Sequence, residues 1–397
     1  MTPLAVTAYT ATSAMGCGLA AQLDALRHAR SGLRPNDIST TPLDCWIGRV
    51  DGVEAIALPA ALEAWDCRNN RLAWLGLNQD GFLQRVHAAR ARYGAGRIAL
   101  LLGTSTASID ATEKAYRQLG PDGAFPDDMR RPAVHTPHSL VAFVAAALEL
   151  DGPCLTISTA CSSSAKVFAS AERLIQLGLI DAAVVGGVDT LCDSVLFGFN
   201  ALELVSTEPC RPFDAARSGI SIGEAAGFAL LERSDTAPDA PQLLGYGEAS
   251  DAHHMSTPHP DGLGAELALN DALARAGLDA AQVDYINLHG TASRKNDEVE
   301  AALVGRAFPA TTRASSTKGY TGHTLGAAGI VEATIALQAI EHGLVPGNLG
   351  GETPDPGCGP QFAWRNEQQR VDVALSNSFG FGGNNACLAF ARAGFVA

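Results

Sequence analysis

The chain of 397 residues has few aromatic side chains (6%), and only 18% of its residues are charged. It lacks an apolar run long enough to cross a bilayer: its most apolar stretch, LVAFVAAALEL (140–150), is too short and contains a glutamate. The first residues lack a basic segment and include Pro3, which argues against a secretory signal. We therefore expect a cytoplasmic protein that does not enter a membrane.

Basic residues are scarce, with 28 Lys and Arg against 42 Asp and Glu, a net charge of −14. This balance excludes nonspecific nucleic-acid binding, and an acidic protein partner would require a local basic patch. The nine cysteines are odd in number, scattered and free of any CxxC pair. Structural zinc and a disulfide framework are therefore not expected, and a reducing compartment fits best.

Glycine is abundant, with 41 residues, and short β-like runs alternate with helical patterns. The predicted strands are 97–103, 154–158, 182–187, 228–232 and 285–290. The predicted helices are 140–150, 167–178, 264–276 and 296–307. Such alternation predicts an α/β fold built on largely parallel sheets with helical crossovers.

Two segments of similar design suggest an internal duplication. Residues 158–179 and 321–344 each begin with small residues, continue as an apolar helix and end near a glycine. The polar segment APDAPQ (237–242) separates them. We therefore predict two halves, residues 1–240 and 241–397, the first carrying the nucleophilic cysteine and the second both catalytic histidines and a Gly-rich loop.

Cys161 lies within STACSSSAK (158–166), a run of small and hydroxylated residues between a predicted strand and a predicted helix. A thiol at the start of a helix meets free backbone N–H groups and the positive end of the dipole. This position predicts a lowered pKa and a nucleophilic thiolate. The alternative is a cysteine that fills space in the core as a small apolar residue.

Two histidines and a Gly-rich loop are the other candidate catalytic elements. His289 ends a predicted strand, and His323 is expected to open a helix whose dipole keeps the ring neutral. Phe381 lies in SNSFGFGGNNA (376–386), whose N–H groups could donate to an oxyanion. A phosphate loop is rejected because no Lys-Ser/Thr pair follows the glycines. Capping roles for the histidines and a plain turn for the loop remain alternatives.

Five segments together resemble the elongating β-ketoacyl-ACP synthases, which are condensing enzymes of the thiolase fold. The segments are STACSSSAK, CRPFDAARSGISIGEAAG (210–227), HGTASRKNDEVE (289–300), STKGYTGHTLGAAG (316–329) and SNSFGFGGNNA. They occur in the family's order and cover residues 150–397 densely, whereas the earlier residues match more diffusely. The resemblance implies a thiolase-like fold, in which two related βαβαβαββ halves stack as α-β-α-β-α layers.

The resemblance also implies roles for individual residues. The implied catalytic residues are Cys161 as nucleophile, His289 and His323 as its partners, Lys318 and Glu300 as a supporting charge network, and Phe381 as gate and oxyanion donor. The implied substrate-binding residues are Thr291 and Ser293, which match hydroxyls that bind the phosphopantetheine arm, together with Phe379 and Asp297. No cofactor and no metal are expected, since the acyl carrier protein (ACP) carries the phosphopantetheine.

The implied reaction is 3-oxoacyl-ACP synthesis, in which an acyl-cysteine condenses with malonyl-ACP and CO2 is lost. The sequence departs from the usual pattern of this family in two places: it has Arg294 and Lys295 after HGTAS, and it has GEAAG where GEGAG is commoner. They leave open whether the pathway is fatty acid synthesis or a specialised polyketide or polyene pathway. The expected partners are ACP and its acyl and malonyl thioesters, with a homodimer or a pairing with a chain-length-factor homologue. Candidate ACP-docking cations are Arg68, Arg71, Arg130 and Arg131.

Other enzyme classes and a non-enzymatic role are alternatives to this interpretation. A thiolase would need a second cysteine in the Gly-rich loop, where this chain has Phe379 and Phe381. An initiating condensing enzyme would use one His and one Asn, and a chain-length factor would lack Cys161. A cysteine hydrolase and a binding-only scaffold stay open. The sequence HHMSTPH (253–259) offers metal ligands, but Pro258 and the adjacent histidines favour a loop.

Overall fold

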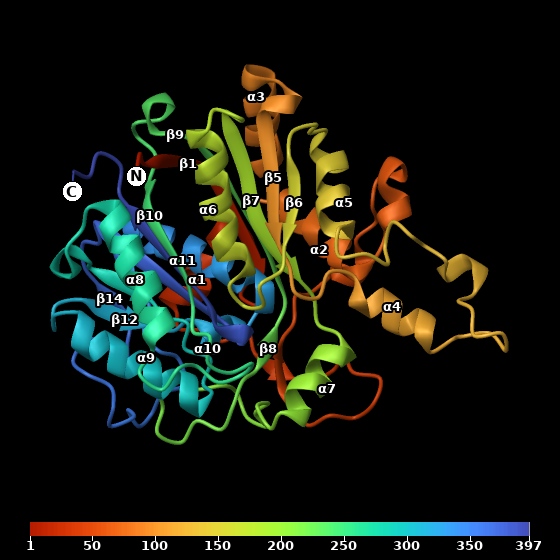
Figure 1. The fold of residues 1–397 in the computed structure, drawn as a ribbon. Helices are drawn as coiled ribbons and strands as arrows, with labels where there is room; N and C mark the ends of the chain where they lie inside the picture. Colours follow the sequence, from red (N-terminus) through yellow and green to blue (C-terminus); the bar gives the residue numbers. More distant parts are fainter. Residues whose placement is uncertain (397) are drawn as a thin grey trace.

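A large mixed sheet organises the molecule in the computed structural model, which describes residues 1–396 (Figure 1). Its first five strands are β1 (Leu4–Ser13), β5 (Ile98–Gly103), β6 (Cys154–Ile157), β7 (Ala182–Asp189) and β9 (Ala225–Arg233). The next five are β10 (Gln242–Ser250), β11 (Tyr285–Asn287), β12 (Arg313–Ser315), β15 (Val373–Gly380) and β16 (Asn384–Ala391). Their order is β12-β11-β15-β16-β10-β1-β9-β7-β5-β6, and β2 (Gly16–Cys17) folds back on β1.

Both halves of this sheet have the same topology. Counted along the chain within each half, the strands lie in the order third, second, fourth, fifth, first. In each half the second strand is parallel to its two neighbours and the fifth is antiparallel to the fourth and the first. The halves meet where β1 pairs with β10 in antiparallel fashion, at Leu4–Leu243 and Ala5–Gln242. The predicted duplicated α/β fold is therefore confirmed, whereas the prediction of largely parallel sheets is wrong, because antiparallel pairs outnumber parallel ones in this sheet. The predicted boundary at residue 240 lies in the connection between β9 and β10 and stays a prediction.

Helices form the remaining layers, as expected from the alternating pattern. The central helices α6 (Ser163–Gln176) and α11 (Ala328–His342) pack against strands of both halves. The outer helices are α1 (Gly18–Arg27), α2 (Arg68–Leu77), α3 (Phe82–Tyr93) and α5 (Ser139–Leu148) in the first half, and α8 (Leu263–Ala276) and α9 (Arg294–Ala307) in the second. In α11 every side chain from Ala328 to Ala339 is buried. A helix that is buried on every side belongs inside a protein, and α11 lies at the centre of this one.

Small residues allow the central helices to approach each other and the sheet. A Cβ added at Gly329 of α11 would lie 2.5 Å from the backbone nitrogen of Ala165 in α6. A Cβ at Gly187, in β7, would lie 2.6 Å from the Ser164 Cβ. The Ser164 hydroxyl accepts the N–H of Ile330 at 2.9 Å, which ties α6 to α11. The many glycines therefore serve tight helix-on-sheet packing.

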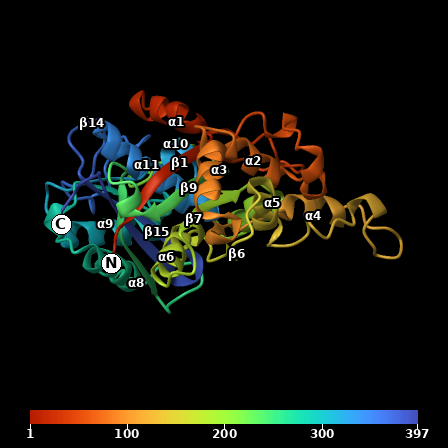
Figure 2. The ribbon, with the colours of Figure 1, turned by 90° about the horizontal axis from the view of Figure 1, so that it is seen from above.

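Shorter elements complete the chain. They are β3 (Arg34–Pro35), β4 (Trp46–Gly48), α4 (Ile109–Tyr116), α7 (Asp193–Ala201), β8 (Ile222–Gly223), α10 (Lys318–Thr321), β13 (Leu344–Val345) and β14 (Glu367–Gln368), with several 3-10 turns. Helix α4 and the loop that follows it extend away from the body (Figures 1 and 2). Within the described part of the chain, no helix has the length and apolar character needed to cross a membrane.

Candidate active site

Cys161 occupies a sharp turn between β6 and α6. Ala160, immediately before it, has φ 54°, a left-handed backbone that a non-glycine residue adopts only under local constraint. Two serine hydroxyls supply that constraint: Ser162 Oγ donates to Thr159 O at 2.9 Å, and Ser163 Oγ donates to Ala160 O at 2.5 Å. The hydroxylated run around the cysteine therefore holds the turn that presents the thiol.

His289 follows β11, and its backbone is held by a buried carboxylate. Glu300 Oε1 accepts the His289 N–H at 2.8 Å, and Oε2 accepts the Gly290 N–H at 2.7 Å. Asn377 Nδ2 also donates to Glu300, at 3.2 Å. Burial raises the pKa of Glu300 to about 7, whereas the N–H donors act to lower it. Glu300 is a positioning residue for His289.

His323 lies between α10 and α11, in the place within the second half that Cys161 occupies in the first. Its N–H donates to Ser221 O at 2.7 Å, and its carbonyl accepts the Gly223 N–H at 2.9 Å. A Cβ at Gly223 would lie 2.3 Å from Thr321 O, so only glycine fits there. Helix α11 begins at Ala328 after a 3-10 turn, so His323 precedes the helix instead of opening it.

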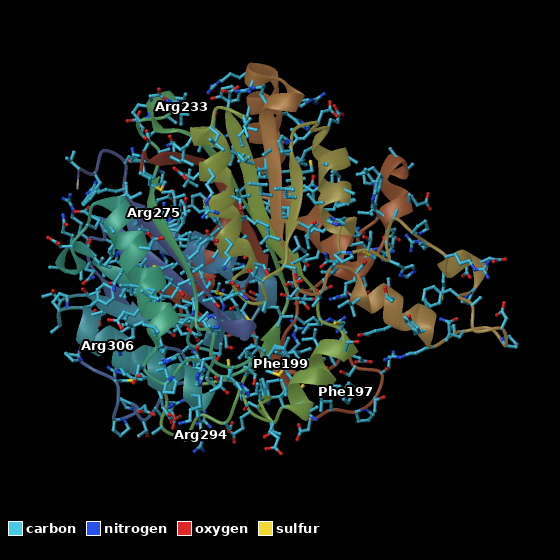
Figure 3. All side chains as sticks on the ribbon, viewed as in Figure 1. Phe197, Phe199, Arg233, Arg275, Arg294 and Arg306 are labelled. Atoms are coloured by element: carbon cyan, nitrogen blue, oxygen red, sulfur yellow. The ribbon has the colours of Figure 1, made fainter. Side chains whose placement is uncertain are left out.

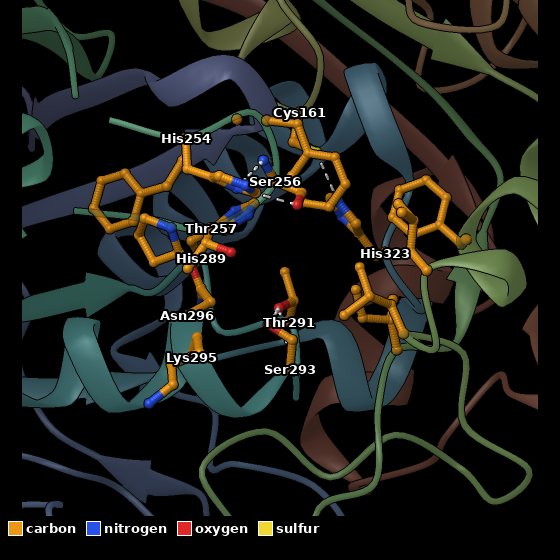
Figure 4. A pocket seen from close by; sticks show the side chains of 18 of the residues that line it. Cys161, His254, Ser256, Thr257, His289, Thr291, Ser293, Lys295, Asn296 and His323 are labelled. Atoms are coloured by element: carbon orange, nitrogen blue, oxygen red, sulfur yellow. Dashed lines mark hydrogen bonds between the residues drawn. The ribbon is translucent and has the colours of Figure 1, made fainter. Parts of the chain in front are cut away.

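The three side chains meet across the boundary between the halves. His323 Nε2 lies 2.9 Å from Cys161 Sγ, and the two imidazole centroids are 5.3 Å apart at 87°. Figure 4 shows Cys161, His289 and His323 around one hollow, with Thr291 and Ser293 on its opposite side. The sequence prediction that one sulfur and two histidines form a cluster agrees with this geometry.

Lys318 stands behind His289 in a fully buried position. Its Nζ donates to the His289 carbonyl and to Glu332 Oε1, and it lies 3.5 Å from His289 Nδ1. The structure therefore pairs Lys318 with Glu332 in α11, whereas Glu300, the other implied member of the charge network, holds the His289 backbone. Glu332 was not predicted as a site residue, although a glutamate within the apolar pattern of 328–339 indicates a buried charge pair.

Both histidines are neutral. Burial is the largest cause that lowers the pKa of His289 and of His323, and the Lys318 cation lowers both further. The helix dipole invoked in the sequence analysis is therefore not needed to explain this. Because Lys318 is a donor, Nδ1 of His289 acts as the acceptor and the proton resides on Nε2. His323 Nδ1 has no hydrogen-bond partner within residues 1–396, which favours the Nε2–H tautomer because a buried orphan N–H is costly.

Cys161 is a neutral thiol in the resting protein, contrary to the prediction of a lowered pKa. Burial raises the pKa of the Cys161 thiol to about 11, against the opposing influence of Lys318 and of the Phe381 N–H. The sulfur precedes the first residue of α6 by two positions and is 5% exposed. At this depth desolvation disfavours the anionic form.

Most of the predicted Gly-rich loop lies on strands β15 and β16, and the turn between them, residues 381–383, lies over the sulfur. Phe379 packs 5.8 Å from the His289 ring, and Phe381 stacks on Phe199 of α7 at 5.5 Å. The Gly382 N–H donates to the Met255 carbonyl at 2.7 Å, which ties this loop to the segment 251–262. Gly382 has φ 77°, a conformation suited to glycine. The loop can thus bring the Phe381 N–H to a group bound at Cys161.

A pocket of about 350 Å³ leads from this cluster to solvent. Its predicted members are Cys161, His289, His323, Thr291, Ser293, Phe379 and Phe381, and further lining residues include Phe199, Leu204, Ile220, Arg294 and Lys295. Thr291 Oγ1 and Ser293 Oγ lie 2.9 Å apart, as a pair of hydroxyls at the mouth. A channel of this size, lined by both apolar and polar side chains, can hold an extended ligand.

Some predicted residues lie outside the pocket. Asp297 is fully buried, accepts the Phe213 N–H at 2.8 Å and lies 3.6 Å from Arg217, so it does not face the substrate. Burial raises its pKa to about 6. The prediction that Asp297 binds substrate is therefore wrong. Asp297 instead positions the Phe213 backbone beside Arg217.

Two of the candidate docking cations, Arg68 and Arg71, form ion pairs with acidic residues of this chain. Arg68 is one-tenth exposed and pairs with the buried Glu224, so it is wrongly predicted as a docking residue. Arg71 is held by Asp66 at 2.5 and 2.6 Å. Arg130 is exposed and lies 3.0 Å from Asp127. None of these side chains lines the catalytic pocket.

The fold and the Cys-His-His site define a condensing enzyme of the thiolase fold. The N-terminal domain of β-ketoacyl synthase matches residues 71–237, and the C-terminal domain of β-ketoacyl synthase matches residues 241–352. The chain therefore belongs to the β-ketoacyl synthase family and is an acyltransferase-class enzyme.

Curated relatives and solved structures agree with this assignment. Nodulation protein E of Rhizobium meliloti (strain 1021) is 36% identical over 86% of this chain and 82% of the relative. The 3-oxoacyl-[acyl-carrier-protein] synthase 2 of the same strain is 40% identical over 62% of each chain. A ketosynthase (ApeO) from Xenorhabdus doucetiae, solved in complex with its chain length factor (ApeC), is 36% identical with a TM-score of 0.90, over 99% of this chain and 98% of that one.

Proposed function

We propose that the protein is a 3-oxoacyl-ACP synthase that condenses an acyl group on Cys161 with malonyl-ACP and releases CO2. The observation that carries the proposal is a buried thiol 2.9 Å from a neutral histidine, with a second neutral histidine 5.3 Å away between ring centroids. Neutral imidazoles that present N–H groups stabilise an enolate oxygen without competing for its proton.

The first stage is transfer of the acyl group to the enzyme. The Cys161 sulfur attacks the acyl thioester, the pantetheine sulfur leaves, and the thiol proton passes to that leaving sulfur. The tetrahedral oxyanion accepts the N–H of Phe381, which is directed at Sγ in the resting site. Thr291 and Ser293, at the mouth, bind the pantetheine arm.

The second stage forms the carbon–carbon bond. The thioester carbonyl of malonyl-ACP accepts N–H bonds from His289 and His323, and cleavage of the carboxylate carbon–carbon bond releases CO2 and leaves an enolate. The enolate carbon attacks the acyl-cysteine carbonyl, and the thiolate that leaves takes a proton from solvent. Each histidine donor contributes roughly 3 kcal/mol, the typical cost of removing one such donor.

Single substitutions separate the two stages. We expect Cys161→Ala to abolish acyl-enzyme formation, because no other described cysteine lines the pocket. We expect His289→Ala to lower condensation about 100- to 1000-fold while Cys161 is still acylated, because the lost donor acts on the enolate. Intact-protein mass spectrometry measures acylation, and release of labelled CO2 from malonyl-ACP measures decarboxylation. Unchanged CO2 release by His289→Ala would refute the role given to His289.

The pathway is the finer part of the proposal. Fatty acid elongation is supported by the relatives named 3-oxoacyl-ACP synthase. A specialised polyketide or aryl-polyene ketosynthase is supported by the Xenorhabdus ketosynthase solved with its chain length factor, which covers almost the whole chain at 36% identity. Products formed from a panel of saturated, unsaturated and 3-oxo acyl-ACP primers distinguish the two, because a fatty acid enzyme elongates saturated chains whereas a specialised enzyme elongates chains that retain double bonds or oxo groups.

The proposed partners are ACP and a second thiolase-fold subunit. Strand β6 ends the sheet, and Leu155 on it is 48% exposed, so this edge is open for pairing with another chain. A homodimer and a heterodimer with a chain-length-factor homologue both fit this edge. Native mass spectrometry of the chain purified from its own cell distinguishes them.

A further inference from the structure

The catalytic cluster has the donor set of a metal site. One ligand atom each from Cys161, His289 and His323 lie within 4.8 Å of one another, and all three residues are buried. Ligand atoms of a tetrahedral zinc ion are about 3.3–3.8 Å apart, so small side-chain rotations would bring these three into range. The pocket would leave a fourth position for water, as in zinc sites with three protein ligands.

Lys318 opposes such binding in two ways. Its ammonium lies 3.5 Å from His289 Nδ1, which makes Nδ1 an acceptor and leaves the proton on Nε2, the nitrogen that a metal would need bare. Its charge also stands beside the cluster and repels a dication. The contact between Lys318 and Nδ1 keeps the proton on Nε2 of His289. The ring can therefore donate an N–H bond to an enolate but cannot bind a metal ion through Nε2.

We propose that Cys161, His289 and His323 form a latent site for a borderline-soft divalent cation such as Zn²⁺, and that Lys318 suppresses it by fixing the tautomer of His289. Lys318 is thus a positioning residue. It keeps the sulfur and the two imidazoles available for catalysis and prevents the same three groups from binding a metal ion. On binding, the metal takes the sulfur as thiolate and the thiol proton goes to solvent.

Glu332 determines what happens when Lys318 is removed. One of its oxygens accepts from Lys318, and the other, Oε2, has no partner within residues 1–396. Without the lysine, this carboxylate becomes available as an acceptor for an Nδ1–H, the arrangement that zinc-bound histidines use. His323 Nδ1 has no such acceptor in the described chain, so the site would stay weaker than a structural zinc site.

Metal titration of the intact protein tests the proposal. Zn²⁺ affinity is measured by competition with a chromophoric chelator, and Co²⁺ serves as a probe through its thiolate charge-transfer band. We expect Lys318→Met to bind Zn²⁺ at least 10-fold more tightly than the wild type does. Changes in the groups that hydrogen-bond to a metal ligand typically alter metal affinity by about 10- to 100-fold, and this is the lower end of that range. The band should vanish in Lys318→Met/Cys161→Ala.

A second variant protects the test against misfolding. Lys318→Met/Glu332→Leu replaces both members of the buried pair by apolar groups, which removes the unpaired carboxylate. It should bind more tightly than the wild type and less tightly than Lys318→Met. Cys17→Ser controls for an exposed thiol and should leave binding unchanged. Equal affinity in the wild type and both Lys318 variants, or binding that survives Cys161→Ala, would overturn the proposal. No carrier or thioester is used, so the result is independent of the proposed condensation.

Discussion

At the scale of single residues, the site depends on groups that burial keeps uncharged. Cys161, His289 and His323 all have pKa values displaced toward their neutral forms, and burial is the largest cause in each case. Lys318 contributes to the neutrality of both histidines. Uncharged partners suit a reaction in which decarboxylation creates the carbanion, because no side chain then has to remove a proton from carbon.

The raised pKa of Cys161 predicts how the thiol reacts with an alkylating agent. Only the thiolate reacts, so with a pKa of about 11 the rate of iodoacetamide labelling should rise about tenfold per pH unit from pH 7 to pH 10. Peptide mass spectrometry isolates the Cys161 signal from the exposed Cys17 and Cys154. Circular dichroism verifies that the fold is intact at each pH. A rate that levels off near pH 7 would show that the helix dipole prevails over burial.

Residue types at the site could be predicted from the sequence, whereas their electrostatic state could not. The small residues around Cys161 and the glycines around His323 indicated presented side chains. Depth of burial depends on packing between the halves, so neither the raised pKa of the thiol nor the buried Lys318–Glu332 pair was accessible from local sequence. Asp297 was placed near the substrate by the family resemblance alone, and its side chain turns toward Phe213 instead.

At the scale of elements, a strand and a turn fix the position of one catalytic ring. Strand β8 passes beside His323: Ser221, immediately before β8, accepts the His323 N–H, and Gly223 in β8 donates to the His323 carbonyl. The ranges predicted from the sequence match β5, β6, β7, β9, β11, α5, α6, α8 and α9 to within about four residues, because apolar runs and small-residue breaks mark them, whereas β15, β16, α2 and α3 were not predicted. Strand β8 was not predicted either, since a two-residue strand leaves no periodic pattern.

Gly223→Ala should therefore damage both stability and catalysis. The added Cβ would lie 2.3 Å from Thr321 O, and the shift needed costs ~1–3 kcal/mol. A displacement of His323 of about 1 Å would lower kcat about 100-fold. Gly305→Ala is the matched control, because nothing lies within 4 Å of its added Cβ in α9, and it should stabilise by ~0.5–1 kcal/mol. Thermal unfolding and condensation assays measure both effects, and wild-type behaviour of Gly223→Ala would contradict this account.

At the scale of the whole molecule, the chain is acidic but has cations at the pocket mouth. The net charge is −14, yet Arg294 and Lys295 line the opening. Lys295 pairs with Glu298 at 2.9 Å, and within the described chain Arg294 has no ion pair. Figure 3 shows Arg294 at the lower edge of the molecule, far from Arg233 at the top. An acidic carrier would be oriented toward the mouth by this local charge.

Charge reversal tests that orientation. Arg294→Glu/Lys295→Glu should raise the KM for acyl-ACP about threefold to tenfold and leave the KM for a small N-acetylcysteamine thioester unchanged, because only the carrier is negatively charged. Arg233→Glu serves as the control and should change neither value. Added salt should reduce the difference between the variant and the wild type. An equal loss with both substrates would assign these residues to the channel itself.

The sulfur enters the site from one repeat and both imidazoles from the other, with a single short connection between β9 and β10 linking the two. If the chain were cut within 234–241, each fragment would hold an incomplete set of reacting groups and would not condense thioesters. Condensing activity would return only when the two fragments associate, so an activity assay of the mixed fragments would measure how well the two repeats bind each other.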